Sequence, residues 1–224
     1  MILRIGYIEN EFEITADKVL ALEIENKKYF YRTVLGLYSL SRGEMVEEFQ
    51  FYDSSMNEMK NPNILIINDF FNIDLDSKKI STELHKNIIS EIDEKMMQEL
   101  VKNYKKIYNS FNKILHNIDL PLTMIQDFNP DVFIKTLKIS VERKDELLDN
   151  LLLLIDIEKN LNINNAIFFI NLKQYLTNSE LVELYKYSIY SSVPIVLIDS
   201  QTYGVTLEYE KKIIIDDNLD EFVL

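Results

Sequence analysis

Short apolar runs alternate with longer amphipathic segments along most of the chain. Runs rich in Val, Leu, Ile and Phe are typical of strands that are buried on both faces of a sheet. Segments whose apolar residues recur every three or four positions are typical of helices. The predicted strands cover residues 18–24, 48–52, 64–69, 166–171, 193–199 and 211–216. The predicted helices cover residues 27–41, 77–90, 93–117, 130–138, 143–161 and 179–191.

The order of these segments predicts the fold class and the domains. Strands and helices alternate in residues 1–76 and 162–224, which indicates an α/β fold with a mostly parallel sheet. Residues 77–161 carry helical patterns only. We therefore expect an α/β head made from residues 1–76 and 162–224, with residues 77–161 inserted as an α-helical arm.

The segment 93–117 predicts the longest helix, with two opposite faces of different character. Its apolar face carries Met96, Leu100, Tyr104, Ile107, Phe111 and Leu115. The opposite face carries Lys95, Lys102, Lys106 and Lys113 in a narrow strip. The apolar face is expected to pack within the arm. The strip is either an ordinary solvated helix face or a surface that contacts phosphates, and helix geometry alone does not separate the two.

The predicted helix 143–161 is apolar almost all round, with eight Leu and Ile residues between positions 147 and 157. Such a helix is covered on more than one side. We expect a second copy of the protein to supply part of the cover; burial within one chain and docking of another protein are the alternatives.

Charge and composition exclude several classes of site. The chain has 224 residues, with 24 Lys and Arg against 37 Asp and Glu, and its formal charge is −13. Binding of nucleic acid would therefore require basic residues gathered on one surface. The absence of cysteine excludes disulfides, thiol nucleophiles and Cys-ligated zinc, and two histidines disfavour His-dependent sites. No apolar run could span a bilayer and the start does not resemble a signal peptide, so we expect a cytoplasmic protein.

The turn between residues 24 and 27 lies where a nucleotide-binding α/β protein carries its phosphate loop. The glycine-rich loop ending in Gly-Lys-Ser/Thr is absent, and Glu25 and Asn26 stand there instead. We expect no ATP hydrolysis at this position. Lys27 and Lys28 could still contact a phosphate at the helix start, although solvated lysines are the simpler interpretation.

Acidic residues raise two metal hypotheses. Asp69 and Asp199 end predicted strands, the usual position of magnesium ligands in nucleotide enzymes, so a Mg-dependent phosphoryl-transfer enzyme is the alternative function. Turn and cap roles are the simpler explanation of both. Four acidic residues near the joint of the arm helices have oxygen ligands that would suit calcium. Their spacing matches no EF-hand, and Asp131 also lies at a predicted helix start. These candidates are Asp119, Asp127, Asp131 and Glu142.

Several short stretches, read together, resemble one known family. They are residues 9–11, 19–23, 51–53, 59–60, 63–69, 73–77, 166–171, 175–181 and 195–199. In these stretches and in the order of head, arm and head, the chain is similar to the small adaptation protein of type II-A CRISPR–Cas systems.

The resemblance implies a specific function and assembly. The head would be a degenerate phosphate-loop NTPase-like fold without nucleotide or catalysis. Four copies would form a ring that binds double-stranded DNA ends without sequence preference, through lysines lining its hole. Calcium near the head–arm joint would support the ring, with the four acidic candidates as ligands. The partners would be the integrase proteins and the effector nuclease that act in spacer acquisition. The DNA-contacting candidates are then Lys95, Lys102, Lys106 and Lys113, followed by Lys27, Lys28, Lys105, Lys135 and Lys138.

Overall fold

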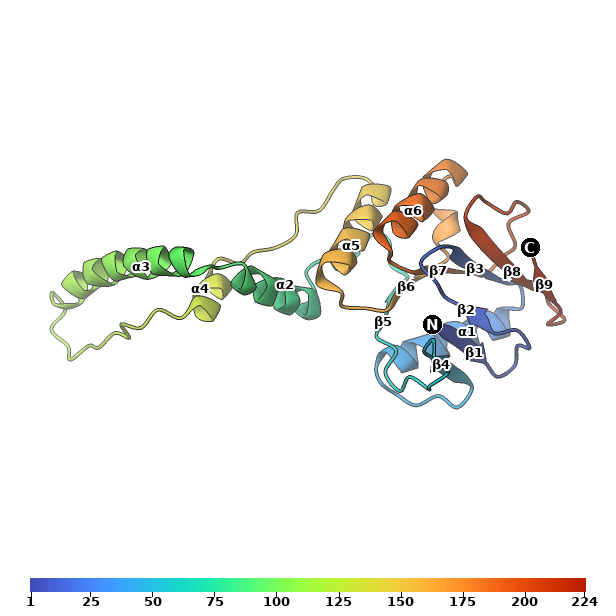
Figure 1. Ribbon diagram of the computed structural model, residues 1–224, viewed down its shortest axis with the longest axis horizontal. Helices are drawn as coiled ribbons and strands as arrows, with labels where there is room; N and C mark the ends of the chain where they lie inside the picture. The colour runs from blue at the N-terminus through green and yellow to red at the C-terminus, as the bar shows by residue number, and fades with distance from the viewer. The chain divides into compact units, whose positions relative to one another are not determined.

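The computed structural model describes residues 1–224, which form two compact units (Figure 1). The head unit consists of Met1–Leu75 and Arg143–Leu224, and the arm unit of Asp76–Glu142. The expected boundary at residue 161 is therefore wrong, because the helix that follows residue 143 belongs to the head. Each unit is described by itself below.

The head is built on a six-stranded sheet in the order β5-β6-β7-β3-β8-β9. All neighbouring strands are parallel except β9, which runs antiparallel to β8. This confirms the predicted α/β class with a mostly parallel sheet. The strands are β3 (Val19–Ile24), β5 (Ile64–Ile67), β6 (Ala166–Ile170), β7 (Ile195–Asp199), β8 (Glu210–Ile215) and β9 (Glu221–Val223). Every residue of β3, β6 and β7 is buried, as their uninterrupted apolar sequences predict.

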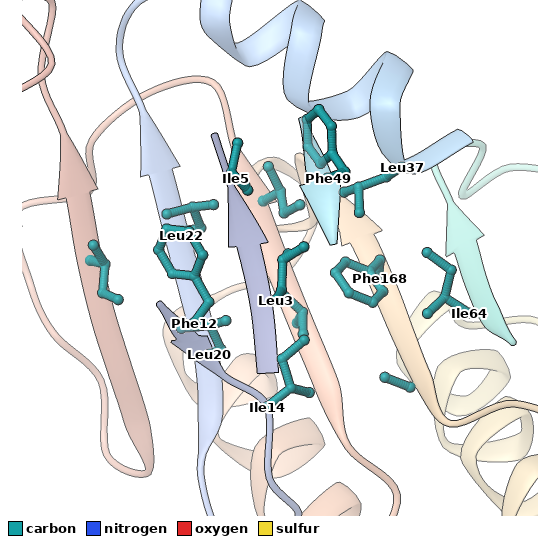
Figure 2. Packing of buried hydrophobic residues seen from close by; sticks show 14 of the residues in the cluster. Leu3, Ile5, Phe12, Ile14, Leu20, Leu22, Leu37, Phe49, Ile64 and Phe168 are labelled. Atoms are coloured by element: carbon teal, nitrogen blue, oxygen red, sulfur yellow. The ribbon is translucent and has the colours of Figure 1, made fainter. Parts of the chain in front are cut away.

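A second, antiparallel sheet of three strands packs on one face of the large sheet. Its order is β2-β1-β4, with β1 at Ile2–Ile5, β2 at Phe12–Glu13 and β4 at Phe49–Tyr52. The apolar side chains of these strands meet those of β3, β6 and β7 in the main core (Figure 2). Phe51, for example, meets Phe168 edge to face, with ring centroids 6.2 Å apart.

Helix α1 (Lys27–Ser41) lies on the same side of the large sheet and has the predicted bounds. The Asn26 side chain caps its first turn, and Gly43 follows its end with a φ of 77°. Only glycine adopts that backbone conformation without strain. The close approach of Gly36 to the ring of Phe49 holds α1 against the three-stranded sheet.

Helices α5 (Leu147–Leu161) and α6 (Asn178–Ser191) cover the opposite face of the large sheet. Leu151, Leu154 and Ile155 of α5 are fully buried within one chain. The head therefore supplies the cover of these residues. Leu148, Leu152 and Leu153 of the same helix are only partly buried, and cover of this helix by a second copy stays a prediction. The short helix η1 (Leu172–Gln174) precedes α6, whose first turn is closed by a capping box between Thr177 and Glu180.

The arm unit contains three helices, α2 (Lys78–Ser90), α3 (Glu94–Leu115) and α4 (Pro130–Thr136). Ser77, Asp93 and Asn129 cap their N-termini through side-chain oxygens. Helices α2 and α4 pack together, and the segment between α3 and α4 has no regular secondary structure. No helix of the chain combines the length and the apolar character needed to cross a bilayer.

Candidate nucleic-acid interface

All nine lysines proposed as DNA contacts have exposed side chains. They are Lys27, Lys28, Lys95, Lys102, Lys105, Lys106, Lys113, Lys135 and Lys138. None of them takes part in an ion pair with an acidic side chain. Seven lie in the arm unit, whereas Lys27 and Lys28 begin α1 in the head unit.

Four of these lysines form one strip along α3, as the sequence predicts. At about 100° per residue, Lys95, Lys102, Lys106 and Lys113 fall within roughly 40° of one another around the helix axis. We call these four residues the lysine strip. Residues 100–118 contain no Asp or Glu, so the part of the strip from Lys102 to Lys113 is a locally cationic surface in a chain of charge −13, whereas Lys95 has Glu94 and Glu99 near it in the helix. Such a surface can contact phosphates along a nucleic-acid backbone without reading bases.

The remaining arm lysines are less well placed for the same contact. Lys105 lies about 80° around the helix axis from the centre of the strip. Lys135 is in the last turn of α4, and Lys138 follows that helix with a left-handed φ of 50°. These three lysines extend the positive charge of the arm but do not form a second row.

The apolar face of α3 is covered only in part. The Tyr108 hydroxyl donates to the carbonyl oxygen of Met124 at 3.4 Å, and the Tyr104 and Phe128 rings lie 5.3 Å apart. The segment after α3 therefore covers one edge of the face. Other side chains of this helix remain about half exposed, namely Met96, Ile107, Phe111 and Ile114 at 51–56%. The expectation that this face packs within the arm is thus correct only for its covered edge.

The four calcium candidates do not form a site within one chain. Asp119, Asp127, Asp131 and Glu142 are all exposed, and no three Asp, Glu or His side chains of the chain gather as metal ligands. Asp131 lies in the first turn of α4, where its charge complements the helix dipole. The residues of a single chain therefore do not fit a calcium ion.

The turn at the position of a phosphate loop is closed by its own side chains. Asn26 Oδ1 accepts hydrogen bonds from the backbone N–H groups of Lys28 and Tyr29, at 3.1 and 3.3 Å. These are groups that a phosphate would use at a helix start. Next to it, the Glu25 carboxylate accepts a hydrogen bond from Thr202 at 2.5 Å. A capped helix start beside a carboxylate is a poor site for a triphosphate.

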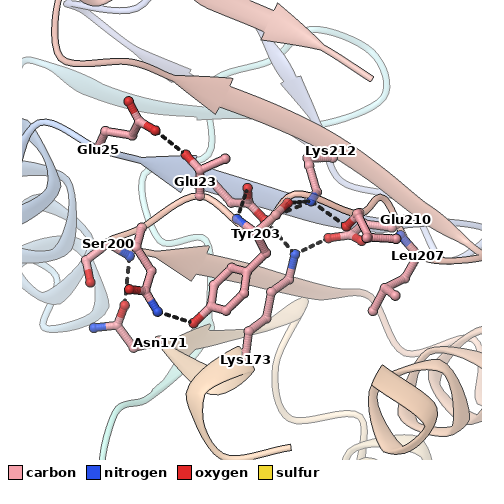
Figure 3. A network of polar contacts seen from close by, with 12 residues as sticks. Glu23, Glu25, Asn171, Lys173, Ser200, Tyr203, Leu207, Glu210 and Lys212 are labelled. Atoms are coloured by element: carbon pink, nitrogen blue, oxygen red, sulfur yellow. Dashed lines mark hydrogen bonds and ion pairs between the residues drawn. The ribbon is translucent and has the colours of Figure 1, made fainter. Parts of the chain in front are cut away.

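A buried network of charged side chains lies on the sheet face that α6 covers (Figure 3). Lys173 Nζ lies 2.8 Å from Glu23 and also contacts Glu210, and Lys212 Nζ lies 3.1 Å from Glu23. These four residues are at most 7% exposed. The network also fixes the loop between β7 and β8, because Tyr203 N–H donates to Glu23 and Lys212 donates to the Tyr203 carbonyl.

Asp199 adjoins this network but is not satisfied by it. The residue is fully buried, and neither of its carboxylate oxygens accepts a hydrogen bond. Burial, together with the charges of Glu23 and Glu210, raises the pKa of Asp199 to about 7 against the opposing effect of Lys173. Burial alone would lower the pKa of the Lys173 ammonium, but Glu210 and Glu23 raise it above its ordinary value.

The two acids of the alternative enzyme are not brought together. Asp69 is exposed after β5, and its Oδ1 accepts from the N–H groups of Phe71 and Asn72. Asp199 ends β7, and β6 lies between these two strands. Asp69 therefore shapes a turn, and no magnesium site joins it to Asp199.

Known proteins resemble this chain both in sequence profile and in fold. The profile of the CRISPR-associated protein family Cas_Csn2 matches residues 43–219. The fold is similar to the crystal structure of Stu0660 of Streptococcus thermophilus, with a TM-score of 0.67 and 12% identity over 100% of this chain and 76% of that one. No curated protein sequence matches the chain significantly. The family profile spans most of the sequence, and the chain belongs to the CRISPR-associated Cas_Csn2 family.

Proposed function

We propose that this protein binds double-stranded DNA ends without sequence preference, as a homotetrameric ring, during CRISPR spacer acquisition. The observation that carries the proposal is the lysine strip on α3, which is exposed and free of ion pairs, and whose three residues Lys102, Lys106 and Lys113 lie in a segment without Asp or Glu. Membership of a CRISPR-associated family supports a role in that system. The integrase proteins and the effector nuclease are the proposed partners.

The proposed activity is binding rather than catalysis. The head would be a phosphate-loop NTPase-like fold in which the loop has been lost. The capping of the α1 start by Asn26 supports this view, because the N–H groups that would hold a phosphate are already used. The separation of Asp69 and Asp199 by β6 gives no support to a magnesium-dependent phosphoryl transfer.

The open part of the α3 apolar face supports assembly into a ring. Side chains such as Ile107 and Phe111 are about half exposed in one chain, and an apolar surface of this kind is stabilised when a second subunit covers it. Calcium enters the proposal only as an ion held by carboxylates of more than one subunit, because one chain gathers no three ligands. Sedimentation velocity in calcium and in a chelator tests this part, with a tetramer expected in calcium and smaller species in chelator.

A comparison of linear and closed circular DNA tests the proposed function directly. The two DNAs should have the same sequence and length, because they then differ only in the presence of ends. A ring that loads onto ends should shift the linear form and leave the relaxed closed circle unbound. Equal binding of both forms would reject loading at ends while leaving phosphate contact intact, and no binding of either form would reject the proposal as a whole.

A further inference from the structure

The head unit contains a pocket lined by aromatic and basic side chains, and none of the nine lysines proposed as DNA contacts lies in it. It has a volume of about 290 Å³ and is lined by Phe70, Phe71, Ile73, Arg143, Lys144, Asp145, Leu147, Asn150 and Tyr175. The loops that carry the aromatic residues follow β5 and β6, which are adjacent and parallel. The pocket therefore lies at the carboxyl edge of the sheet, where open α/β folds commonly bind ligands.

The aromatic side chains are held with one ring buried and one ring open. Phe70 is 8% exposed and packs against Phe169 and Tyr175, with centroids 6.3 and 5.2 Å apart. Phe71 is 85% exposed and stands edge to face with Tyr175, with centroids 5.7 Å apart at 89°. The backbone N–H of Phe71 donates to Asp69 Oδ1 at 3.1 Å, so a hydrogen-bonded turn holds Phe71 outward. An open ring on a fixed turn is a platform on which another flat ring can stack.

The rim supplies positive charge next to this platform. Arg143 and Lys144 are exposed, and the lining contains only one carboxylate, that of Asp145, in a chain of charge −13. One nitrogen of the Arg143 guanidinium, Nη2, donates to the Ile73 carbonyl oxygen at 2.5 Å, which fixes the group beside the pocket. A guanidinium has five donor N–H groups, so it can also contact a phosphate.

We infer that this pocket binds an unpaired nucleotide at a DNA end, with the base stacked on the open ring of Phe71 and its phosphate contacted by Arg143 and Lys144. The inference rests on the proposed function and adds to it a preference among ends. Stacking tolerates any base because each base has a π-face, which suits a protein that reads no sequence. Blunt ends would leave this pocket empty, whereas the unpaired nucleotide of a single-stranded overhang would fill it.

The test measures binding of two duplexes that share one sequence and differ only by a short single-stranded overhang carrying 2-aminopurine. The wild-type protein should bind the overhang duplex more tightly and quench the 2-aminopurine fluorescence. Phe71→Ala should weaken overhang binding by roughly tenfold, leave blunt-end binding unchanged and abolish the quenching. Lys144→Gln should weaken overhang binding only. Tyr190→Ala, which removes an aromatic side chain that is 80% exposed on α6, is the matched control and should change neither.

The outcomes separate this inference from the proposed function. Binding of blunt duplex by every variant, with no preference for the overhang and no quenching, would overturn the pocket and leave end binding standing. Failure of the wild type to bind either duplex would overturn both. Free 2-aminopurine deoxyribonucleoside monophosphate distinguishes the source of the nucleotide: quenching of this compound without quenching of the overhang duplex would overturn the assignment to a DNA end.

Discussion

Lys173 and Glu23 lie 150 positions apart in the sequence, yet Lys173 Nζ sits 2.8 Å from Glu23 Oε1 in the interior of the head. Lys173 also contacts Glu210, so one ammonium bridges two buried carboxylates, and Lys212 supplies the second positive charge beside Glu23. Through Glu23 and Glu210 the contact also fixes backbone N–H groups of the loop that follows β7. Lys173 therefore links the two carboxylates that hold this loop, and Lys212 holds the same loop through the Tyr203 and Val205 carbonyls.

Replacement of Lys173 should destabilise the head strongly. Lys173→Met leaves Glu23 and Glu210 buried with less compensating charge, and we expect a loss of about 3–5 kcal/mol in the free energy of unfolding. The measurement is urea unfolding at pH 7, read from the midpoint at an unchanged slope. Lys186→Met is the control, because Lys186 is half exposed and its ion pair with Glu208 is long, at 3.8 Å. This substitution should cost less than about 1 kcal/mol. A loss below about 1 kcal/mol for Lys173→Met would show that the network does not hold the loop.

Asp199 should make stability depend on pH in a particular direction. Its folded pKa is about 7 and the ordinary value is 3.8, so the folded state binds the proton more tightly. This group's contribution is therefore most favourable below about pH 4 and is lost as the pH rises through about 7. Asp199→Asn is neutral at every pH and should be more stable than the wild type at pH 8, by on the order of 2 kcal/mol. The measurement is urea unfolding of both proteins at pH 8 and at pH 5. The stability advantage of Asp199→Asn over the wild type should be smaller at pH 5. An advantage of the same size at both pH values would contradict a raised pKa of Asp199 in the folded state.

The contact between Gly36 and Phe49 should tolerate no side chain. A methyl group at position 36 would overlap the Phe49 ring, which is 3% exposed and surrounded by the main core. We expect Gly36→Ala to lower the free energy of unfolding by about 1–2 kcal/mol, although alanine favours a helix more than glycine does. Gly204→Ala is the control, since no atom lies within 4 Å of the new methyl group. Thermal unfolding of both variants is the measurement, and a Gly36→Ala protein as stable as the wild type would mean that α1 can shift away from β4.

The sequence predicted the parts of the fold that depend on local pattern. Helix α1 and the fully buried strands β6 and β7 have close to the expected bounds, because an uninterrupted apolar run has few other folded environments. Helix α5 begins at Leu147 rather than residue 143. The reason is that the Asn150 side chain bonds the backbone of Lys144 and Glu146 and holds residues 144–146 outside the helix. Helix α6 begins one residue earlier than expected, because Thr177 rather than Asn178 forms the cap.

The candidate site also has a part that the sequence predicts and a part that it does not. The lysine strip follows from helical periodicity, so its four residues could be named before the structure was known. The buried network requires the order of the strands in space, which brings Glu23 of β3 next to Lys212 of β8. Its local signals were charged residues inside predicted strands, namely Glu23 in the run 19–24 and Lys212 in the run 211–216. The antiparallel strand β9 was also missed, because three residues at a sheet edge carry too short a pattern.

The central claim is that the lysine strip contacts the DNA backbone, and the salt dependence of binding tests it most directly. The measurement is the affinity for a linear duplex at several salt concentrations, for the wild type, for Lys102→Glu with Lys106→Glu, and for Lys18→Glu with Lys60→Glu. The second pair makes the same charge change at two exposed head lysines.

We predict that reversal of Lys102 and Lys106 weakens binding at least about tenfold. It should also reduce the slope of log affinity against log salt by roughly two for each subunit in contact with DNA. The control pair should retain the wild-type slope. Equal affinity and equal slope for the wild type and the Lys102→Glu, Lys106→Glu protein would contradict the account.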